Sequence, residues 1–422
     1  MTDLVPFGGE QGRRPRVLRR PAALAAAAAA VVLLAAAVAA VTLAGGAGHP
    51  LGSHPAGAHA ARAKAAVPPP VVTLTPADGT GGVPLDARVR VAVKAGELRS
   101  VTVARAGGRT LAGHTTGPRA WVSSAPLAPG ARYQVSVEVV DGAGRAARRI
   151  ASFATLTPTH TLKTSIMPLD GQRVGVGLPI VVWLNRPARD PAAKAAVERR
   201  LEVDSDPPVL GAWHWFSATE VHWRPRRFWP SGTRVTVHAD LAGLHLGGGT
   251  WGVADRTVRF TVGDRRVSVV NVNSHQMTVT LNGKVLRTLP VSTGRDKYPT
   301  TNGIHFVVEK TQDELMDSAT VGIPRDSPDG YYEHVFWSVR ISDSGEFVHA
   351  APWSVGAQGH ANVSHGCVNL STPDAQWFYG FAQPGDIVQV VGSPKRPGGS
   401  FGVADWNMSW SRWLAGSALQ SS

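Results

Sequence analysis

Two stretches of the chain carry the same three landmarks in the same order, and this repeat limits most strongly what the chain can fold into. Each stretch opens with a Pro-x-Asp-Gly turn, has a turn containing Pro and Gly before a run of alternating polarity, and closes with a short run around a phenylalanine. The landmarks lie at 76–79, 127–130 and 152–155 in the first stretch and at 168–171, 229–232 and 259–262 in the second. The sequence therefore predicts two copies of one module, over residues 71–157 and 158–263, with loop insertions.

Short runs of alternating polarity within both modules predict β-strands. Val89–Val93 and Tyr133–Val137 place apolar side chains at every second position, the period of a strand with one buried face. Modules of about 100 residues with such strands, bounded by Gly and Pro, are typical of immunoglobulin-like β-sandwiches. Neither module shows a cluster of titratable groups, so we expect both to act as spacers. Carbohydrate binding is the alternative to packing for four tryptophans of the second module: Trp213, Trp215, Trp223 and Trp229.

A third, mostly-β unit is predicted over residues 264–392. Asn282-Gly283 separates two apolar runs and favours positive φ at both central positions of a type I′ hairpin. Further along, Thr372 at the N-cap and Pro373 at the first helical position predict a helix. The whole chain is thus predicted to be mainly β, with two immunoglobulin-like β-sandwiches followed by a mostly-β domain that has one or two short helices.

Three tryptophans mark the last segment, residues 393–422. Trp406, Trp410 and Trp413 are spaced by four and three residues, which places them on one face of a helix. We expect this face to pack on the third unit, in preference to contact with a membrane or a glycan.

The N-terminus determines the predicted compartment. Residues 1–21 form a basic tail with five arginines, and residues 22–44 follow as an apolar segment. Its first twenty residues contain no polar or charged side chain and span about 30 Å as a helix, the thickness of a hydrocarbon core. With the arginines held on the cytoplasmic side, we expect a single-pass signal-anchor in the cell membrane, an Ala/Gly/Pro linker over 45–70, and the remainder outside. The alternative is secretion after cleavage of the segment.

The formal net charge of +13 bears on the partners of the chain. Such a charge suits an anionic membrane surface or an anionic polymer of a cell wall. The arginines are spread along the chain, and no basic patch interleaved with aromatic residues follows the N-terminal tail. We therefore expect no nucleic acid among the partners.

Cys367 is the only cysteine among 422 residues, in a chain predicted to be exported. Exported proteins usually place cysteines in disulfides, and a single cysteine cannot form one internally. It is left with an intermolecular bridge, an inert buried position, a zinc site with His349, His360 and His365, or a role as nucleophile. Its polar, loop-like neighbours favour the nucleophile, and we expect neither a metal nor a cofactor.

A nucleophilic thiol needs help from its surroundings. The pKa of a free thiol is about 8.5, so acyl transfer requires a histidine that takes the proton, a group that orients this histidine, and N–H donors for the oxyanion. His349 and His365 are candidates for the histidine. Gly366 lets the backbone approach the reacting group closely.

The residues around the cysteine resemble those of a known family. The chain resembles the peptidoglycan L,D-transpeptidases, the YkuD-like family, in its signature: His349, a spacer of fourteen residues, Ser364-His365-Gly366-Cys367 and then Asn369. A second family motif is matched by Ser292-Thr293-Gly294 with Pro299-Thr300 and Gly303. The resemblance covers about Val267 to Trp413, and the layout of the whole chain resembles that of membrane-anchored mycobacterial and actinobacterial members.

The resemblance implies a role for each residue of the site. Cys367 attacks the amide between the third stem residue and D-Ala, D-Ala leaves, and a side-chain amine of a neighbouring stem resolves the thioester into a 3→3 cross-link. His349 is the acid/base, while His365 and Gly366 shape the nucleophile turn, where backbone N–H groups near Gly366 and Cys367 form the oxyanion hole. The positions implied to contact substrate are Ser344, Gly345, Ser364 and Asn369, together with Met316, Tyr331 and Trp353 at a lid over the cleft. From their pattern alone, Met316 and Trp353 would be core residues.

The implied partners are peptidoglycan stem peptides, a tetrapeptide donor and a diamino-acid acceptor, with carbapenem β-lactams as covalent inhibitors. Two alternatives stay open: an L,D-carboxypeptidase, in which water resolves the thioester, and a non-catalytic scaffold that binds the wall. Several relatives have serine where this chain has Ala350. We expect the backbone carbonyl at this position, not a hydroxyl, to orient His349.

Overall fold

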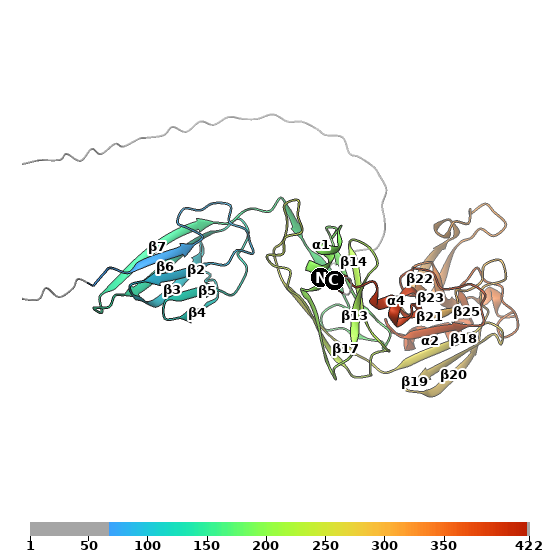
Figure 1. The fold of residues 1–422 in the computed structure, drawn as a ribbon. Helices are drawn as coiled ribbons and strands as arrows, with labels where there is room; N and C mark the ends of the chain where they lie inside the picture. The colour runs from blue at the N-terminus through green and yellow to red at the C-terminus, as the bar shows by residue number, and fades with distance from the viewer. Residues whose placement is uncertain (1–66, 420–422) are drawn as a thin grey trace, which may run out of the picture. The chain divides into compact units, whose positions relative to one another are not determined.

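The computed structural model describes residues 67–419, and over this range the chain is mainly β (Figure 1). The fold class predicted from the sequence is confirmed. The predicted basic tail, the signal-anchor and most of the linker lie outside the described residues. Within 67–419, no helix is long and apolar enough to cross a membrane.

The first module is a sandwich of two antiparallel sheets, ordered β1-β2-β5-β4 and β3-β6-β7. Along β6, Tyr133, Val135 and Val137 are buried and the residues between them are not, as the alternating sequence predicts. The strands are β1 (Val71–Thr75), β2 (Arg90–Lys94), β3 (Glu97–Arg105), β4 (Gly113–Gly117), β5 (Ala120–Ser123), β6 (Arg132–Val140) and β7 (Ala146–Ala154).

The second module pairs a sheet ordered β10-β17-β15-β12 with one ordered β13-β14-β11-β9. Its elements are β8 (His160–Leu162), β9 (Thr164–Met167), β10 (Arg173–Val174), β11 (Ile180–Leu184), α1 (Pro191–Glu198), β12 (Leu201–Asp206), β13 (Gly211–Trp215), β14 (Glu220–Pro225), β15 (Arg234–Ala239), β16 (Thr250–Gly252) and β17 (Arg256–Val262). The short helix α1 was not predicted. It begins where Asp190 accepts a hydrogen bond from the Ala193 backbone N–H and Pro191 takes the first turn.

The tryptophans of the second module lie in its core. Trp213, Trp215, Trp223 and Trp229 have exposed fractions of 7%, 7%, 6% and 2%. The indole N–H of Trp229 donates to the Leu178 carbonyl at 2.9 Å, which satisfies its one polar atom. The packing interpretation is therefore confirmed, and the carbohydrate-binding alternative is wrong for these four side chains.

The third unit packs a five-stranded sheet, ordered β20-β19-β18-β26-β21, and a four-stranded sheet, ordered β22-β23-β24-β25. Asn282 and Gly283 have φ values of 51° and 84°, which confirms the type I′ turn between β19 and β20. The elements are β18 (Arg266–Asn271), β19 (Gln276–Leu281), β20 (Lys284–Pro290), β21 (Gly303–Phe306), β22 (Glu309–Asp317), η1 (Ser318–Val321), β23 (Tyr332–Ser342), β24 (Glu346–Ala350), η2 (Pro352–Ser354), β25 (Val368–Leu370), α2 (Thr372–Phe381) and β26 (Ile387–Val391).

The N-cap of helix α2 lies one residue before the predicted one. Ser371 is the N-cap, because its backbone is extended and its hydroxyl accepts from the Asp374 backbone N–H at 3.3 Å. Thr372 is already helical. The helix lies against β23 and β24, and Phe378 is buried in the core of the third unit.

The second module and the third unit share a hydrophobic core. Phe306 and Ile387 of the third unit belong to the buried cluster of the sandwich. The Gly177 backbone N–H donates to the Gly385 carbonyl at 2.8 Å. A Cβ on Gly175 would lie 2.2 Å from the backbone nitrogen of Asp386, so the close approach of the two backbones requires glycine there.

The C-terminal segment forms α3 (Ala404–Asn407) and α4 (Trp410–Leu414), and its tryptophans pack mainly on the second module. Trp413 is fully buried, and its indole N–H donates to the Ala212 carbonyl at 2.9 Å. The Arg224 guanidinium lies over the rings of Trp406, Trp410 and Trp413 at 4.9, 5.2 and 4.5 Å. The expected packing on the third unit is therefore wrong for these rings, because a buried cation of the sandwich attracts their faces. The segment packs on the third unit through other residues: the Gly402 carbonyl accepts from the Phe306 backbone N–H at 3.0 Å, and the side-chain oxygen of Asn407 accepts from the Ile304 backbone N–H at 2.9 Å.

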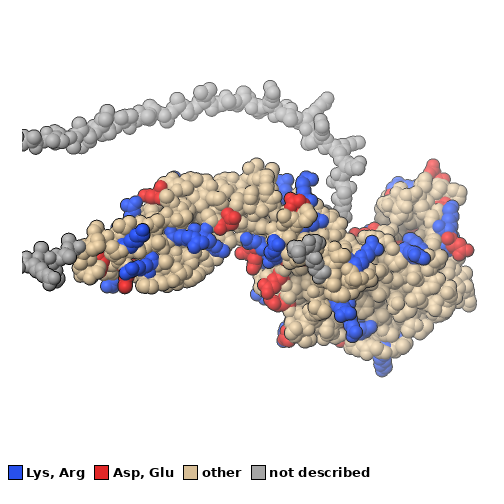
Figure 2. Space-filling view, in the orientation of Figure 1, with Lys and Arg blue, Asp and Glu red and all other residues tan. Residues whose placement is uncertain are grey.

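Basic and acidic side chains are interspersed on the face of the molecule that Figure 2 shows. On the face shown in Figure 2, Lys and Arg side chains are spread over the described part of the chain among Asp and Glu. The excess of positive charge is therefore distributed and does not form one patch on this face.

Candidate active site

The strand pairing of the third unit brings His349 and Cys367 into one site. Cys367 directly precedes β25, which runs parallel to β24 with Val348 opposite Val368 and His349 opposite Asn369. His349 and Cys367 line the same cavity of about 250 Å³. The two ends of the sequence signature therefore meet across neighbouring strands.

The turn before Cys367 is fixed by hydrogen bonds on both sides. Ser364 Oγ accepts from the Gly366 backbone N–H at 3.1 Å and donates to the Cys367 carbonyl at 2.7 Å. Thr300 Oγ1 donates to the Gly366 carbonyl at 2.8 Å. Gly366 has a φ of +127°, a conformation that essentially only glycine adopts.

These bonds narrow the expected oxyanion hole to one of its two N–H groups. The Gly366 N–H already donates to Ser364, so it is not free to donate to substrate in this state. The Cys367 N–H remains as the candidate donor in this turn. Gly366 thus serves the site through its backbone conformation.

His349 is held in a single orientation. It is buried, and its Nδ1–H donates to the Ala350 carbonyl at 2.9 Å. This bond assigns the proton to Nδ1 and leaves the lone pair on Nε2. Burial lowers the pKa of His349 to about 4, against which the Ala350 carbonyl acts in the opposite direction. The expectation that a carbonyl orients this histidine is confirmed, so alanine at 350 costs the site nothing in this respect.

The thiol of Cys367 is protonated at neutral pH. Burial raises its pKa to about 12, which outweighs a hydrogen bond from the Phe347 backbone. The Sγ lies 3.7 Å from the Gly345 carbonyl oxygen, to which the thiol donates. Cys367 and His349 are therefore both neutral, and a base must remove the thiol proton as the nucleophile attacks.

His365 has a structural part in the turn. Its Nε2 accepts from the Arg295 guanidinium at 2.8 Å, and its ring lies 5.1 Å from each of the rings of Tyr298 and Tyr331. Burial and then Arg295 lower its pKa. With its Nε2 lone pair engaged and its ring against two tyrosines, His365 is placed to shape the turn, as the resemblance implies.

Two arms of the cleft meet at Cys367. The first, which we call the tryptophan arm, is the cavity of about 250 Å³ lined by Met316, Tyr331, Glu333, His349, Trp353, Ser364 and Asn369, among others. The second, the lysine arm, has about 510 Å³ and is lined by Lys297, Tyr298, Tyr331, Ser344, Gly345, Glu346 and Lys395, among others. Every residue that the sequence assigned to substrate contact thus lines one arm or the other.

Met316 and Trp353, which the sequence pattern alone would place in a hydrophobic core, line the cleft. Trp353 is 57% exposed, with its ring 6.2 Å from that of His349. Met316 lies on β22 opposite Glu333 of β23 and lines the tryptophan arm. The core placement suggested by the pattern is therefore wrong for both residues, and their contact with substrate stays a prediction.

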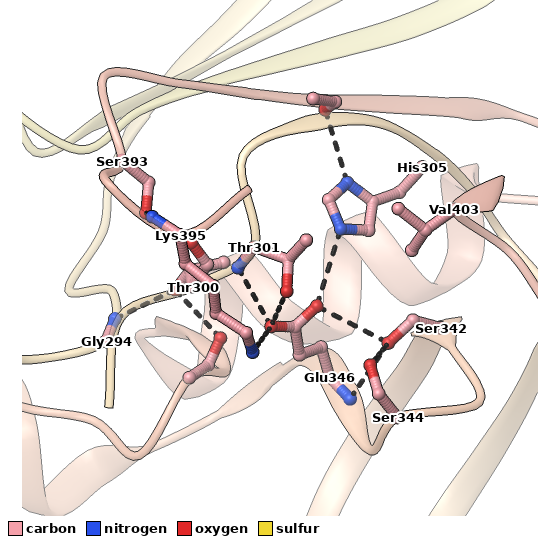
Figure 3. A network of polar contacts seen from close by, with 12 residues as sticks. Gly294, Thr300, Thr301, His305, Ser342, Ser344, Glu346, Ser393, Lys395 and Val403 are labelled. Carbon is pink, nitrogen blue, oxygen red and sulfur yellow. Dashed lines mark hydrogen bonds and ion pairs between the residues drawn. The ribbon is translucent and has the colours of Figure 1, made fainter. Parts of the chain in front are cut away.

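A buried carboxylate behind the turn was missed by sequence reasoning. Glu346 is 3% exposed, and its Oε1 accepts from the Thr301 backbone N–H at 2.8 Å and from Lys395 Nζ at 3.0 Å (Figure 3). Its other oxygen lies 3.4 Å from Nε2 of the buried His305. Burial raises the pKa of Glu346, but these partners lower it further, to about 2. The carboxylate is therefore ionised. It joins its own strand β24 to residues 301–305 and to the segment around Lys395, beside the nucleophile turn.

Sequence signals for these additional residues are weak. Glu346 lies three residues before His349, and the sequence shows no partner for a charge at this position. Lys395 follows the last strand in a Pro- and Gly-rich run. The zinc alternative gains no support, since no group of three or more metal-binding side chains occurs within residues 67–419.

Comparison with known proteins places this site in a family. Residues 80–245 match the bacterial Ig domain family, and residues 265–390 match the L,D-transpeptidase catalytic domain, the YkuD family. L,D-transpeptidase 2 of Mycobacterium tuberculosis is 41% identical over 355 residues, which are 83% of this chain and 85% of that protein. The chain belongs to the L,D-transpeptidase family.

Other members show similar agreement. L,D-transpeptidase 5 of Mycobacterium tuberculosis is 37% identical over 363 residues, 83% of this chain and 78% of that protein. A solved structure of the L,D-transpeptidase LdtMt1 in complex with imipenem shares 39% identity, with a TM-score of 0.49 over 56% of this chain and 100% of that one. As a member of the L,D-transpeptidase family, the protein is an enzyme that acts on peptidoglycan.

Proposed function

We propose that this L,D-transpeptidase forms 3→3 cross-links in peptidoglycan through a thioester on Cys367. The observation that carries the proposal is the shared cavity of Cys367 and His349, with the tautomer of His349 fixed so that Nε2 can accept a proton. In the first half-reaction Sγ bonds to the carbonyl carbon of the third stem residue. The amide bond to D-Ala breaks, and the thiol proton passes through His349 to the departing amine.

The second half-reaction reverses these roles. The side-chain amine of an acceptor stem attacks the thioester carbon, a new amide bond forms, and the bond to Sγ breaks. His349 takes a proton from the attacking amine and the thiolate regains one. No cofactor enters either step, and the donor and the acceptor are the partners that the mechanism needs.

The electrostatics of the free site support general-base catalysis. Because burial raises the pKa of Cys367 to about 12, the thiol of the free enzyme is protonated at pH 7. A neutral histidine that removes the proton during attack contributes typically about 10²- to 10⁴-fold to the rate. His349 is neutral at this pH because burial lowers its pKa to about 4. The pair is thus suited to act together when substrate excludes water from the cleft.

Carbapenem β-lactams are expected inhibitors on the same grounds. Their strained amide is an acyl donor that a thiol activated by His349 can open. The proposed product is a stable acyl-enzyme on Cys367, which blocks both arms of the cleft because Sγ lines both.

The proposed location is the outer face of the cell membrane. It rests on the apolar segment 22–44 and the arginines before it. Membrane fractionation of cells that express the full chain tests it. Release of the protein by detergent, but not by salt, with an intact N-terminus agrees with an anchor. A protein in the medium that begins after residue 44 agrees with cleavage.

Product analysis tests the proposed reaction. The full chain is incubated with disaccharide-tetrapeptide, and the products are weighed. Dimers that have lost one D-Ala, joined from the third residue of the donor, agree with the proposal. Tripeptide monomers without dimers would make the enzyme an L,D-carboxypeptidase, and unchanged substrate would leave only the scaffold role.

A further inference from the structure

The lysine arm of the cleft contains a cation from outside the matched catalytic region. The catalytic-domain match ends at residue 390, and Lys395 follows β26 by four residues. Pro394 and Lys395 line the same arm as Cys367 and Ser344. The segment after the last strand therefore supplies part of the active-site wall.

Several bonds hold this segment in place. The Asn302 backbone N–H donates to the Lys395 carbonyl at 2.7 Å, and Ser393 Oγ donates to the Thr300 carbonyl. Thr300 in turn donates to Gly366 in the nucleophile turn. Lys395 is thus connected through two residues to the backbone beside Cys367.

The ammonium group of Lys395 is anchored but not saturated. Its Nζ donates to Glu346 Oε1 at 3.0 Å, and its side chain is 45% exposed. An ammonium has three N–H donors, so two are left for a ligand in the arm. Glu346 does not depend on Lys395 alone, since Thr301 donates to the same oxygen twice, at 2.8 and 2.7 Å.

The two arms differ in charge. The tryptophan arm contains the carboxylate of Glu333, and none of the described residues that line it is Lys or Arg. The lysine arm is lined by two cations, Lys297 and Lys395, and by one carboxylate, that of Glu346. Lys297 is paired with Asp329, which also accepts from Arg295. Lys395 is paired with Glu346, whose carboxylate is buried. An anionic group of the substrate is therefore better accommodated in the lysine arm.

The proposed reaction requires an anion close to the scissile bond. A donor that loses one terminal residue carries its free carboxylate on the residue directly after the scissile carbonyl, about 3.8 Å further along the Cα trace. A charge-assisted hydrogen bond between ammonium and carboxylate is among the stronger polar contacts available. We propose that Lys395 binds the terminal carboxylate of the donor stem in the lysine arm and so selects donors that end one residue after the scissile amide. This inference rests on the proposed function of the same site.

The test compares two donors on the full chain. One is the disaccharide-tetrapeptide with its free D-Ala carboxylate, and the other ends in D-alaninamide. The value of kcat/KM for release of the last residue is measured for the wild type, Lys395→Gln and Lys395→Arg. The matched control is Arg396→Gln, which removes the same charge from the neighbouring exposed residue that does not line the arm.

We expect the kcat/KM of the wild type to be about tenfold higher for the carboxylate donor. This factor corresponds to the lower end of the energies of hydrogen bonds to charged groups, because the site is partly exposed. Lys395→Gln abolishes the preference by lowering kcat/KM for the carboxylate donor only, Lys395→Arg retains it, and Arg396→Gln changes neither value. A wild type without preference would overturn the inference, as would an equal loss on both donors in Lys395→Gln, which would assign Lys395 to holding Glu346. If the wild type releases neither terminal residue, the proposed function fails and this inference with it.

Discussion

Replacing Trp413 with alanine tests how the C-terminal segment is attached. The ring is fully buried, stacks on His214 at 4.8 Å and lies 4.5 Å from the Arg224 guanidinium. Its indole N–H donates to the Ala212 carbonyl. Trp413→Ala removes all of these contacts and leaves a cavity between the segment and the second module.

The expected cost is large. Truncation of a buried tryptophan to alanine lowers the free energy of unfolding by about 3–5 kcal/mol. Loss of the contact with Arg224 accounts for about 1 kcal/mol of that figure. For a folding unit of more than 200 residues, the thermal midpoint should fall by roughly 10 °C.

Thermal unfolding followed by circular dichroism provides the assay, with Trp410→Ala as the matched control. Trp410 lies over the same guanidinium at 5.2 Å but is only half-buried, so its loss should cost about 1 kcal/mol. Equal shifts for the two variants would show that burial of Trp413 does not hold the segment. A shift below about 2 °C for Trp413→Ala would refute the packing argument itself.

Three further predictions concern the turn and two histidines. Gly366→Ala places a side chain on a residue with a φ of +127°, while the nearest atoms to the new Cβ lie 3.9 Å away, so the strain is in the backbone and not in packing. The value of kcat/KM should fall by about 10²-fold with an unchanged circular dichroism spectrum. Near-normal activity would contradict the strain argument. The profile of kcat/KM against pH should lose activity only toward about pH 4, where His349 becomes protonated, and a limb near pH 6.5 would show that its pKa is not lowered. Burial disfavours the charged form of His222, but Asp405 and Glu220 raise its pKa to about 9. Since the folded pKa exceeds the unfolded value of 6.5, about 3 kcal/mol of stability is present below pH 6.5 and is lost as the pH rises through 9, and urea titrations should show this slope disappear in Asp405→Asn.

Local sequence patterns predicted the elements whose structure depends on near neighbours. Asn282-Gly283 forms its turn because both residues tolerate positive φ, whatever surrounds them. The alternating runs form strands because one face is buried. The N-cap was predicted at Thr372 but is Ser371. Both residues carry a hydroxyl that can cap a helix, and only the extended backbone at Ser371 decides between them.

Long-range packing determined what the sequence could not reveal. The three C-terminal tryptophans were predicted to share a face, but their partner, Arg224, lies in another module and has no local signature. Lys395 and Glu346 are 49 residues apart and meet only because two chain segments cross behind the nucleophile turn. The occupied N–H of Gly366 depends on the rotamer of Ser364, which no pattern specifies.

The most direct test of the central claim is the intact mass of the full chain during turnover of disaccharide-tetrapeptide, quenched in acid. We predict a covalent adduct with the mass of the donor less D-Ala, attached to Cys367 by peptide mapping and absent from Cys367→Ala. The same adduct on Cys367→Ala, or release of D-Ala by that variant at the wild-type rate, would contradict a thioester on Cys367.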